Sequence, residues 1–158
     1  MRKALAISAA AAAILILPGV SAGSRVSTNT YKLRASMNTQ QVVTPKNRRW
    51  RAPASVRNAH GSFAGTMTAS GARRTLRWRI TYAGVGRSQP RVADIHYGKP
   101  GHFGAVLVRL CGPCKSGQSG TKKVTAAGAR AIQTGSAWIT IITPKYPNGV
   151  IRGQIKAS

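Results

Sequence analysis

Three short stretches of the chain combine residue types that could do chemistry. Cys111-Gly112-Pro113-Cys114 places two thiols at the C-x-x-C spacing of dithiols that exchange with disulfides. Asp94 and His96 would share one face of a β-strand, where a carboxylate and an imidazole could bind copper or zinc or relay a proton. Arg48-Arg49-Trp50-Arg51 surrounds an indole with guanidinium groups, so the ring could stack on a base or a sugar while the arginines hold anionic oxygens.

The dithiol favours a structural disulfide over a redox centre. Its four letters match the thioredoxin active site, but there the motif opens a helix after a parallel strand. Here residues 115–120 (KSGQSG) follow, a composition typical of a loop, and no strand–helix–strand pattern surrounds them. We therefore expect Cys111 and Cys114 to form a local disulfide in an oxidising compartment, and a thiol–disulfide oxidoreductase is the weakest alternative.

The other two groups also have purely structural interpretations. Asp94 is the only side-chain carboxylate of the chain, so on a polar strand face it would pair with one of the many arginines. Trp50 could anchor its loop to the domain while the neighbouring arginines point to water. The sequence contains no second carboxylate for acid–base hydrolysis, no nucleophile elbow and no phosphate-binding loop. We therefore predict a protein that is not an enzyme and needs no cofactor.

The chain is extremely basic, with 25 lysines and arginines against one acidic residue and a formal net charge of +24. Ion pairs within the protein cannot balance this charge, so anions must screen it. Two interpretations stay open: a surface that binds anionic polysaccharide, teichoic acid, anionic lipid or nucleic acid, or the adaptation of an exported surface to its surroundings. The candidate polyanion-binding residues are Arg48, Arg49, Trp50, Arg51, Arg77 and Arg79, with Lys32 and Arg34 extending them if their strands share a sheet.

The first 22 residues have the plan of a secretory signal peptide. Arg2-Lys3 precedes an apolar run over residues 4–17, Pro18 breaks it, and Val20-Ser21-Ala22 offers small residues for cleavage. The run is short for a transmembrane helix, which leaves an uncleaved anchor as the less favoured alternative. Cleavage would leave residues 23–158 as a single domain, secreted or associated with the cell envelope, with no transmembrane segment and a net charge two units lower at +22.

Alternation of apolar and polar residues with a period of two predicts an all-β domain. Residues 76–82, for example, alternate apolar side chains with Arg77, Arg79 and Thr81. Helix is scarce, with one short candidate at 124–134, and the polar residues 44–60 indicate a long loop. We predict an antiparallel β-sandwich of about seven to eight strands with little helix. The candidate strands are residues 31–37, 62–67, 76–82, 93–97, 106–110, 138–143 and 151–155.

Two segments of the C-terminal half resemble the chordin-type (CHRD) domain, an extracellular β-domain. Residues 93–110 (ADIHYGKPGHFGAVLVRL) are similar to the family pattern A-H-I-H-x-G-x-x-G-x-x-G-P-V-V-V-x-L, in which spaced glycines punctuate a turn between two strands. Residues 146–154 (YPNGVIRGQ) are similar to its closing pattern Y-P-x-G-x-I-R-G-Q. The resemblance covers roughly residues 30–156 and implies a secreted β-domain, and the short leader and single domain are typical of bacterial proteins.

The family pattern contains three histidines that would cluster on neighbouring strands, as in a copper or zinc site on a β-sandwich. Here Asp94 replaces the first histidine, His96 keeps the second and Ile142 replaces the third. The resemblance implies no catalytic activity. We therefore predict a secreted, non-enzymatic CHRD-like domain that binds anionic polymers or the cell surface. The alternative is a metal-binding β-sandwich that uses Asp94 and His96.

Overall fold

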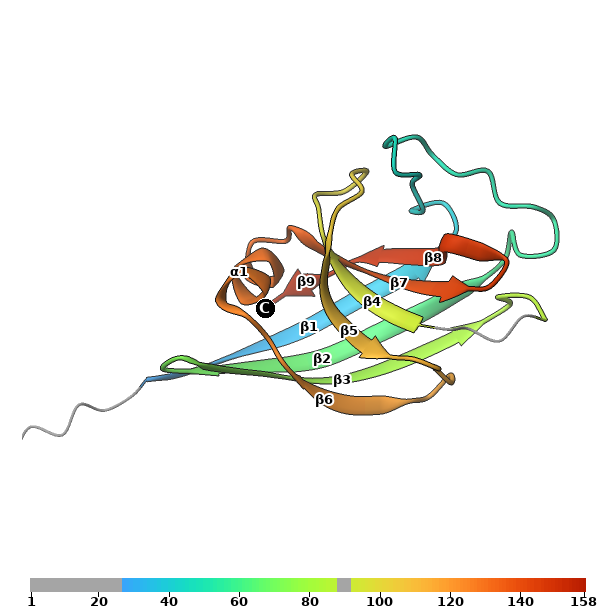
Figure 1. Ribbon diagram of the computed structural model, residues 1–158. Helices are drawn as coiled ribbons and strands as arrows, with labels where there is room; N and C mark the ends of the chain where they lie inside the picture. The colour runs from blue at the N-terminus through green and yellow to red at the C-terminus, as the bar shows by residue number, and fades with distance from the viewer. Residues whose placement is uncertain (1–26, 88–91) are drawn as a thin grey trace, which may run out of the picture.

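The protein is an all-β domain, seen in a computed structural model that describes residues 27–87 and 92–158 (Figure 1). Within these residues it contains nine antiparallel strands and one short helix, which confirms the predicted fold class. The predicted signal peptide, residues 1–22, lies outside the described residues. In the part of the chain that is described, no helix has the length and apolar character needed to cross a membrane.

The strands are mostly longer than the candidate segments of the sequence, and two of them were not predicted. β6 begins within the residues interpreted as a loop after the cysteines, and the two-residue β9 follows the last candidate strand. The helix falls within the predicted residues 124–134. In chain order the elements are β1 (Thr28–Asn38), β2 (His60–Ser70), β3 (Arg73–Ala83), β4 (Val92–Tyr97), β5 (Val106–Cys111), β6 (Ser119–Lys123), α1 (Ala126–Gln133), β7 (Ala137–Thr143), β8 (Tyr146–Gln154) and β9 (Lys156–Ala157).

The strands form one continuous sheet in the order β5-β4-β7-β8-β1-β2-β3-β6, and β9 also pairs with β1. β1 pairs with β2 over its whole length, but it pairs with β8 only where Asn38 lies opposite Arg152. The sheet folds over at this narrow junction into two layers, β1-β2-β3-β6 and β5-β4-β7-β8 (Figure 1). The result is a sandwich-like roll whose outer strands, β5 and β6, contact each other at the opposite edge.

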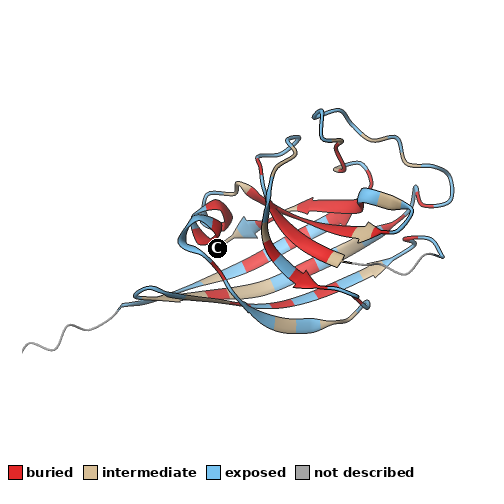
Figure 2. Cartoon of the chain, in the orientation of Figure 1, coloured by how far each residue is buried: buried red, intermediate tan, exposed pale blue. Residues whose placement is uncertain are grey.

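Alternating side chains along each strand separate the core from the surface. On β1, Leu33 and Met37 are buried while Lys32 and Arg34 are exposed, as a period of two requires. Figure 2 shows the same alternation of buried and exposed residues along the neighbouring strands. β7 is buried almost continuously, because both of its faces are covered. Ala137, Ile139 and Ile141 belong to the core. On the outer face, Trp138 is covered by His96, Arg152 and Phe103.

Two connections shape the ends of the roll. Helix α1 is capped by Thr125, whose hydroxyl accepts a hydrogen bond from the backbone N–H of Gly128 at 3.1 Å, and its buried Ile132 joins the core. The sequence predicted a long loop at residues 44–60. In the structure this loop joins β1 to β2 and runs from residue 39 to residue 59, since β1 ends at Asn38 and β2 begins at His60. Val42 and Val56 are buried and hold this loop against the roll.

Candidate functional site

A basic groove lies on the outer face of the β1-β2-β3-β6 layer, with a volume of about 640 Å³. Lys32 and Arg34 of β1 form one wall, and Arg77 and Arg79 of β3 form the other. All four side chains are exposed, and no carboxylate lies among the residues that line the groove. The floor and the far edge consist of Ala64, Gly65 and Thr66 of β2 and Ser119, Gly120 and Thr121 of β6.

The register of the sheet sets the spacing of these four cations. Lys32 and Arg77 lie in one row on either side of Thr66. Arg34 and Arg79 lie in the next row on either side of Ala64. Successive rows are about 7 Å apart along a strand, and the backbones of the two walls are about 10 Å apart. β1 and β3 thus lie in one sheet with these polar side chains outward, which is the condition that the sequence set for the four cations to share a face.

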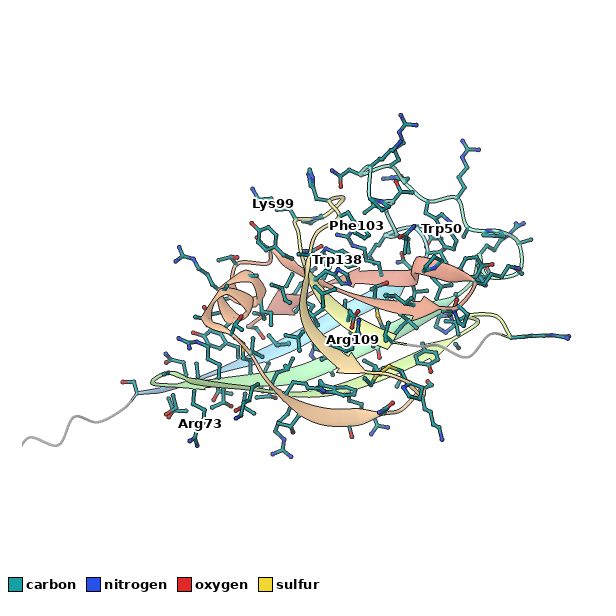
Figure 3. All side chains as sticks on the ribbon, in the orientation of Figure 1. Trp50, Arg73, Lys99, Phe103, Arg109 and Trp138 are labelled. Atoms are coloured by element: carbon teal, nitrogen blue, oxygen red, sulfur yellow. A yellow bond between two sulfur atoms is a disulfide. The ribbon has the colours of Figure 1, made fainter. Side chains whose placement is uncertain are left out.

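The loop residues Arg48, Arg49 and Arg51 are exposed but do not line this groove. Trp50 lies on the loop between β1 and β2 (Figure 3). It is half-buried and packs edge-to-face against Tyr146 of β8, with ring centroids 5.3 Å apart. The indole therefore anchors the loop to the roll, in agreement with the structural interpretation of this residue. A direct contact between this loop and a polyanion stays a prediction.

Asp94 forms the expected ion pair with an arginine. Arg109, on the neighbouring strand β5, approaches it with Nε 3.2 Å from Oδ1 and Nη2 3.4 Å from Oδ2. The Asp94 side chain is only 2 % exposed, so this polar face of the strand, which was expected to be half-exposed, is covered at Asp94. Because this carboxylate is held by a guanidinium, it is not free to act as a general base.

His96, Trp138 and Arg152 form a stack across β4, β7 and β8. The His96 ring lies 4.2 Å from the indole, centroid to centroid, at an interplanar angle of 10°. The guanidinium carbon of Arg152 lies 3.9 Å from the same indole. Two flat groups so close to one ring must occupy its opposite faces, and β4 and β8 do lie on opposite sides of β7. The indole thus offsets part of the cost of burying the cation.

Arg152 and Gln154, from the closing segment I-R-G-Q, are the polar residues whose positions sequence reasoning missed. Arg152 Nη2 donates to the carbonyl of Lys99 at 3.3 Å, and burial lowers the pKa of Arg152 to about 10, so it stays a cation at neutral pH. Gln154 Nε2 donates to the carbonyls of Gly98 at 2.9 Å and Gly135 at 2.8 Å. An arginine and a glutamine just after the apolar residues Val150 and Ile151 were the available signal.

The metal-binding alternative has too few ligands around His96. Its Nδ1 donates to the carbonyl of Gly104 at 2.9 Å, which leaves Nε2 as a buried acceptor without a partner. Within residues 27–87 and 92–158, no three histidine, cysteine, aspartate or glutamate side chains lie close enough together to hold a metal ion. Asp94 and His96 alone are fewer ligands than a copper or zinc site needs, so their geometry does not favour this function.

We expect the stability of the protein to fall as the solution becomes mildly acidic. Burial lowers the pKa of His96, an effect that the Gly104 carbonyl and the charge of Asp94 partly offset. Unfolding therefore takes up a proton once the pH is below about 6.5, the pKa of an unfolded histidine, and stability is lost from there towards the lower folded pKa. Denaturant unfolding between neutral pH and pH of about 5 measures this slope. The dependence of the unfolding free energy on pH should become weaker in His96→Gln. It should persist in His102→Gln, because His102 is exposed. An equal dependence on pH in both variants would contradict this role of His96.

The two cysteines form the predicted disulfide between Cys111, the last residue of β5, and Cys114. Tyr82 of β3 holds the following loop, because its hydroxyl donates to the carbonyl of Cys114 at 3.0 Å and its carbonyl accepts from Ser116 Oγ at 2.9 Å. The chain then continues into β6 and not into a helix. The disulfide therefore secures the connection between the two outer strands of the roll.

Replacing both cysteines with serine should lower the free energy of unfolding by about 2 kcal/mol, since the disulfide closes a loop of only about four residues. Denaturant unfolding of the oxidised protein and of the double variant measures this loss. We also expect the wild-type protein to show no turnover in an insulin-reduction assay. Turnover that disappears in Cys111→Ser would show that the dithiol has a redox role.

The model of the CHRD domain matches residues 33–155, well over half of the chain, and this range includes both walls of the groove at Arg34, Arg77 and Arg79. No curated protein and no solved structure matches the chain significantly. The matched range begins within β1 and ends just after β8, so it spans both layers of the roll. The chain therefore belongs to the CHRD domain family.

Proposed function

We propose that this chain is a secreted, non-enzymatic CHRD domain whose basic groove binds linear anionic polymers of the cell envelope, such as teichoic acid or acidic polysaccharide. The observation that carries the proposal is the placement of Lys32 and Arg34 opposite Arg77 and Arg79 across a floor of small residues. A polymer with regularly spaced phosphates, carboxylates or sulfates can lie along the strands and meet a cation on each side at successive rows.

The overall charge supports this binding mode. The secreted chain, with the net charge of +22 expected after cleavage, attracts a dense layer of small anions, and a polyanion is surrounded by small cations. When the two associate, both sets of counterions are released, which favours binding at low salt and weakens it as salt rises. Because Asp94 is held by Arg109, no side-chain carboxylate is available to neutralise the groove internally.

The chemistry of the groove favours a hydrophilic polymer over nucleobases or a bilayer. Trp78 is the one aromatic residue among those that line it, and this side chain is only 4 % exposed because it belongs to the core. No indole or phenol is therefore available there for the base stacking that single-stranded nucleic acids use. No exposed large apolar side chain lines the groove that could enter a membrane.

Binding of four polyanions at two salt concentrations tests the proposal. We expect teichoic acid and heparin to bind at low salt, with a slope of log affinity against log salt of about −3 to −4 if four cations are neutralised. Poly(dT) should bind no more tightly than heparin, and vesicles of anionic lipid should bind more weakly. Absence of binding at low salt, or binding that does not depend on salt, would contradict the proposal. Tighter binding to poly(dT) or to vesicles would instead identify nucleic acid or a membrane surface as the ligand of the groove.

A further inference from the structure

A second pocket, of about 330 Å³, lies in the other layer of the roll, between β8, the loop after β1 and the loop between β4 and β5. Its lining includes Gln41, Asn47 and Arg49 from the first loop, Gly101 from the second, and Arg152 and Gln154 from β8. None of these residues belongs to the basic groove. The pocket brings together parts of the chain that are far apart in sequence.

Arg152 is the central feature of this pocket. Its side chain is only 2 % exposed, and its Nη1 atom is buried without any hydrogen-bond partner in the described structure. Asp94 is the carboxylate that could balance this charge, but it lies two strands away, on the far side of Thr140. It is also already paired with Arg109. A buried guanidinium with an unsatisfied donor and no anion beside it is costly, and an anionic ligand would supply both the charge and the acceptor.

Hydrogen bonds hold the walls of the pocket in place. Asn47 Oδ1 accepts from the backbone N–H of Phe103 at 2.7 Å, which ties the two loops together, and Asn47 adopts a left-handed backbone with φ of 58°. Gln41 Oε1 accepts from the backbone N–H of Gln154 at 3.3 Å, which ties the first loop to β8. These bonds occupy the acceptor oxygens of both amides, so the Asn47 side chain keeps its N–H groups for a ligand.

Arg49 supplies a second positive charge. It is exposed, it lines the pocket, and it forms no ion pair in the described part of the chain. The titratable residues that line the pocket are therefore Arg49 and Arg152, both of them cations. Guanidinium groups are well suited to phosphate and carboxylate, because their planar N–H groups match two oxygens at once.

We propose that this pocket binds a small oxyanion, a phosphate or a carboxylate, between Arg152 at its base and Arg49, with the Asn47 amide as a further donor. The volume is at the lower end of the range for small-molecule sites, which suits a small anion or the charged end of a chain and not the length of a polymer. This site goes beyond polymer binding in the groove and does not depend on it.

Titration of the full-length protein with inorganic phosphate tests this site, with sodium chloride adjusted to keep the ionic strength constant. Calorimetry should show saturable binding with one phosphate per chain. Arg49→Gln should weaken it by about tenfold, the effect of losing one charge-assisted hydrogen bond. Arg48→Gln is the matched control, because it removes the same charge from the same loop outside the pocket, and it should change the affinity by less than about twofold.

Arg152→Lys tests the base of the pocket and should abolish saturable phosphate binding, because an ammonium cannot make the planar contacts of a guanidinium. Circular dichroism shows whether this buried substitution still folds, and Arg49→Gln, an exposed position, tests the pocket independently of that result. Two outcomes would overturn the proposal: no saturable binding by the wild-type protein, or equal losses in Arg49→Gln and Arg48→Gln.

Two further arms separate this site from the groove and identify the source of the anion. Arg77→Gln/Arg79→Gln should leave phosphate binding unchanged. Loss of phosphate binding in the groove variant instead would place the phosphate in the groove and overturn the pocket. A short glycerol phosphate oligomer that ends in a phosphate monoester should compete with phosphate if the natural ligand is a chain end. Phosphate binding without such competition supports a free anion in the same pocket.

Discussion

Replacing Arg77 and Arg79 together with glutamine should weaken binding to heparin and teichoic acid about thirtyfold at low salt, on the basis of ~1 kcal/mol per cation facing an anionic surface. The same variant should reduce the slope of log affinity against log salt by about two units, since two fewer charges are neutralised. Both residues are exposed on the outer face of β3, so we expect the fold and its stability to be unchanged. Affinity chromatography on heparin and titration with teichoic acid measure the two effects.

The control for this prediction removes the same charge elsewhere. Arg57 and Arg87 are exposed and do not line the groove, so Arg57→Gln/Arg87→Gln has the same net charge as the groove variant. We expect this control to lose much less affinity. If both double variants lose affinity equally, the net charge of the protein drives binding and the groove has no special role. Replacing Arg48 and Arg51 in the same assay measures the contribution predicted for the loop around Trp50.

The largest effect on stability should come from Gly104→Ala. A Cβ atom at this position would overlap the carbonyl group of Tyr97, which is backbone and cannot move alone. The backbone N–H of Tyr97 is bonded to the carbonyl of Ala105 at 2.8 Å, and its carbonyl accepts from the indole N–H of Trp138 at 3.1 Å. The clash must therefore distort the strand that carries His96, and we expect a loss of about 3 kcal/mol or more in the free energy of unfolding.

Gly101→Ala is the matched control, because both glycines belong to the same turn between β4 and β5. A Cβ at Gly101 meets nothing within 4 Å, but its backbone has φ of +79°, so alanine there should cost only about 1 kcal/mol. Gly101→Asn should cost less still, since asparagine tolerates this conformation. Denaturant unfolding of the three variants measures the difference. Similar losses for Gly104→Ala and Gly101→Ala would show that backbone conformation, and not close approach, explains both glycines.

The spacing of these glycines predicted the turn but not the structural role of each glycine. The pattern at residues 98, 101 and 104 predicted a turn between two strands, because glycine is common where a chain reverses direction. It could not distinguish Gly101, which needs a left-handed backbone, from Gly104, which needs space for Tyr97. That difference depends on how tightly the turn packs against β4, which the residue letters do not express.

Local sequence by itself determined the fold class and the side of each strand that faces the core. The alternation of Leu33 with Lys32 and Arg34 depends only on neighbouring residues, so it survives whatever the strands pair with. The expected export and the loop composition after Cys114 made a disulfide with Cys111 the expected state, and the single carboxylate made an ion pair for Asp94 predictable. The local sequence did not identify β6, because its residues Ser119 and Gly120 lack the alternating apolar pattern of a strand.

Only the tertiary structure decided which of the many cations act together. The pairing of the strands places β2 between β1 and β3, so that Ala64 and Thr66 separate two walls of positive charge. The burial of Arg152 on Trp138, and its meeting with Arg49 around one pocket, likewise require segments from opposite parts of the chain. Local patterns report on which side of a strand a residue lies, whereas a binding site depends on which strands and loops become neighbours.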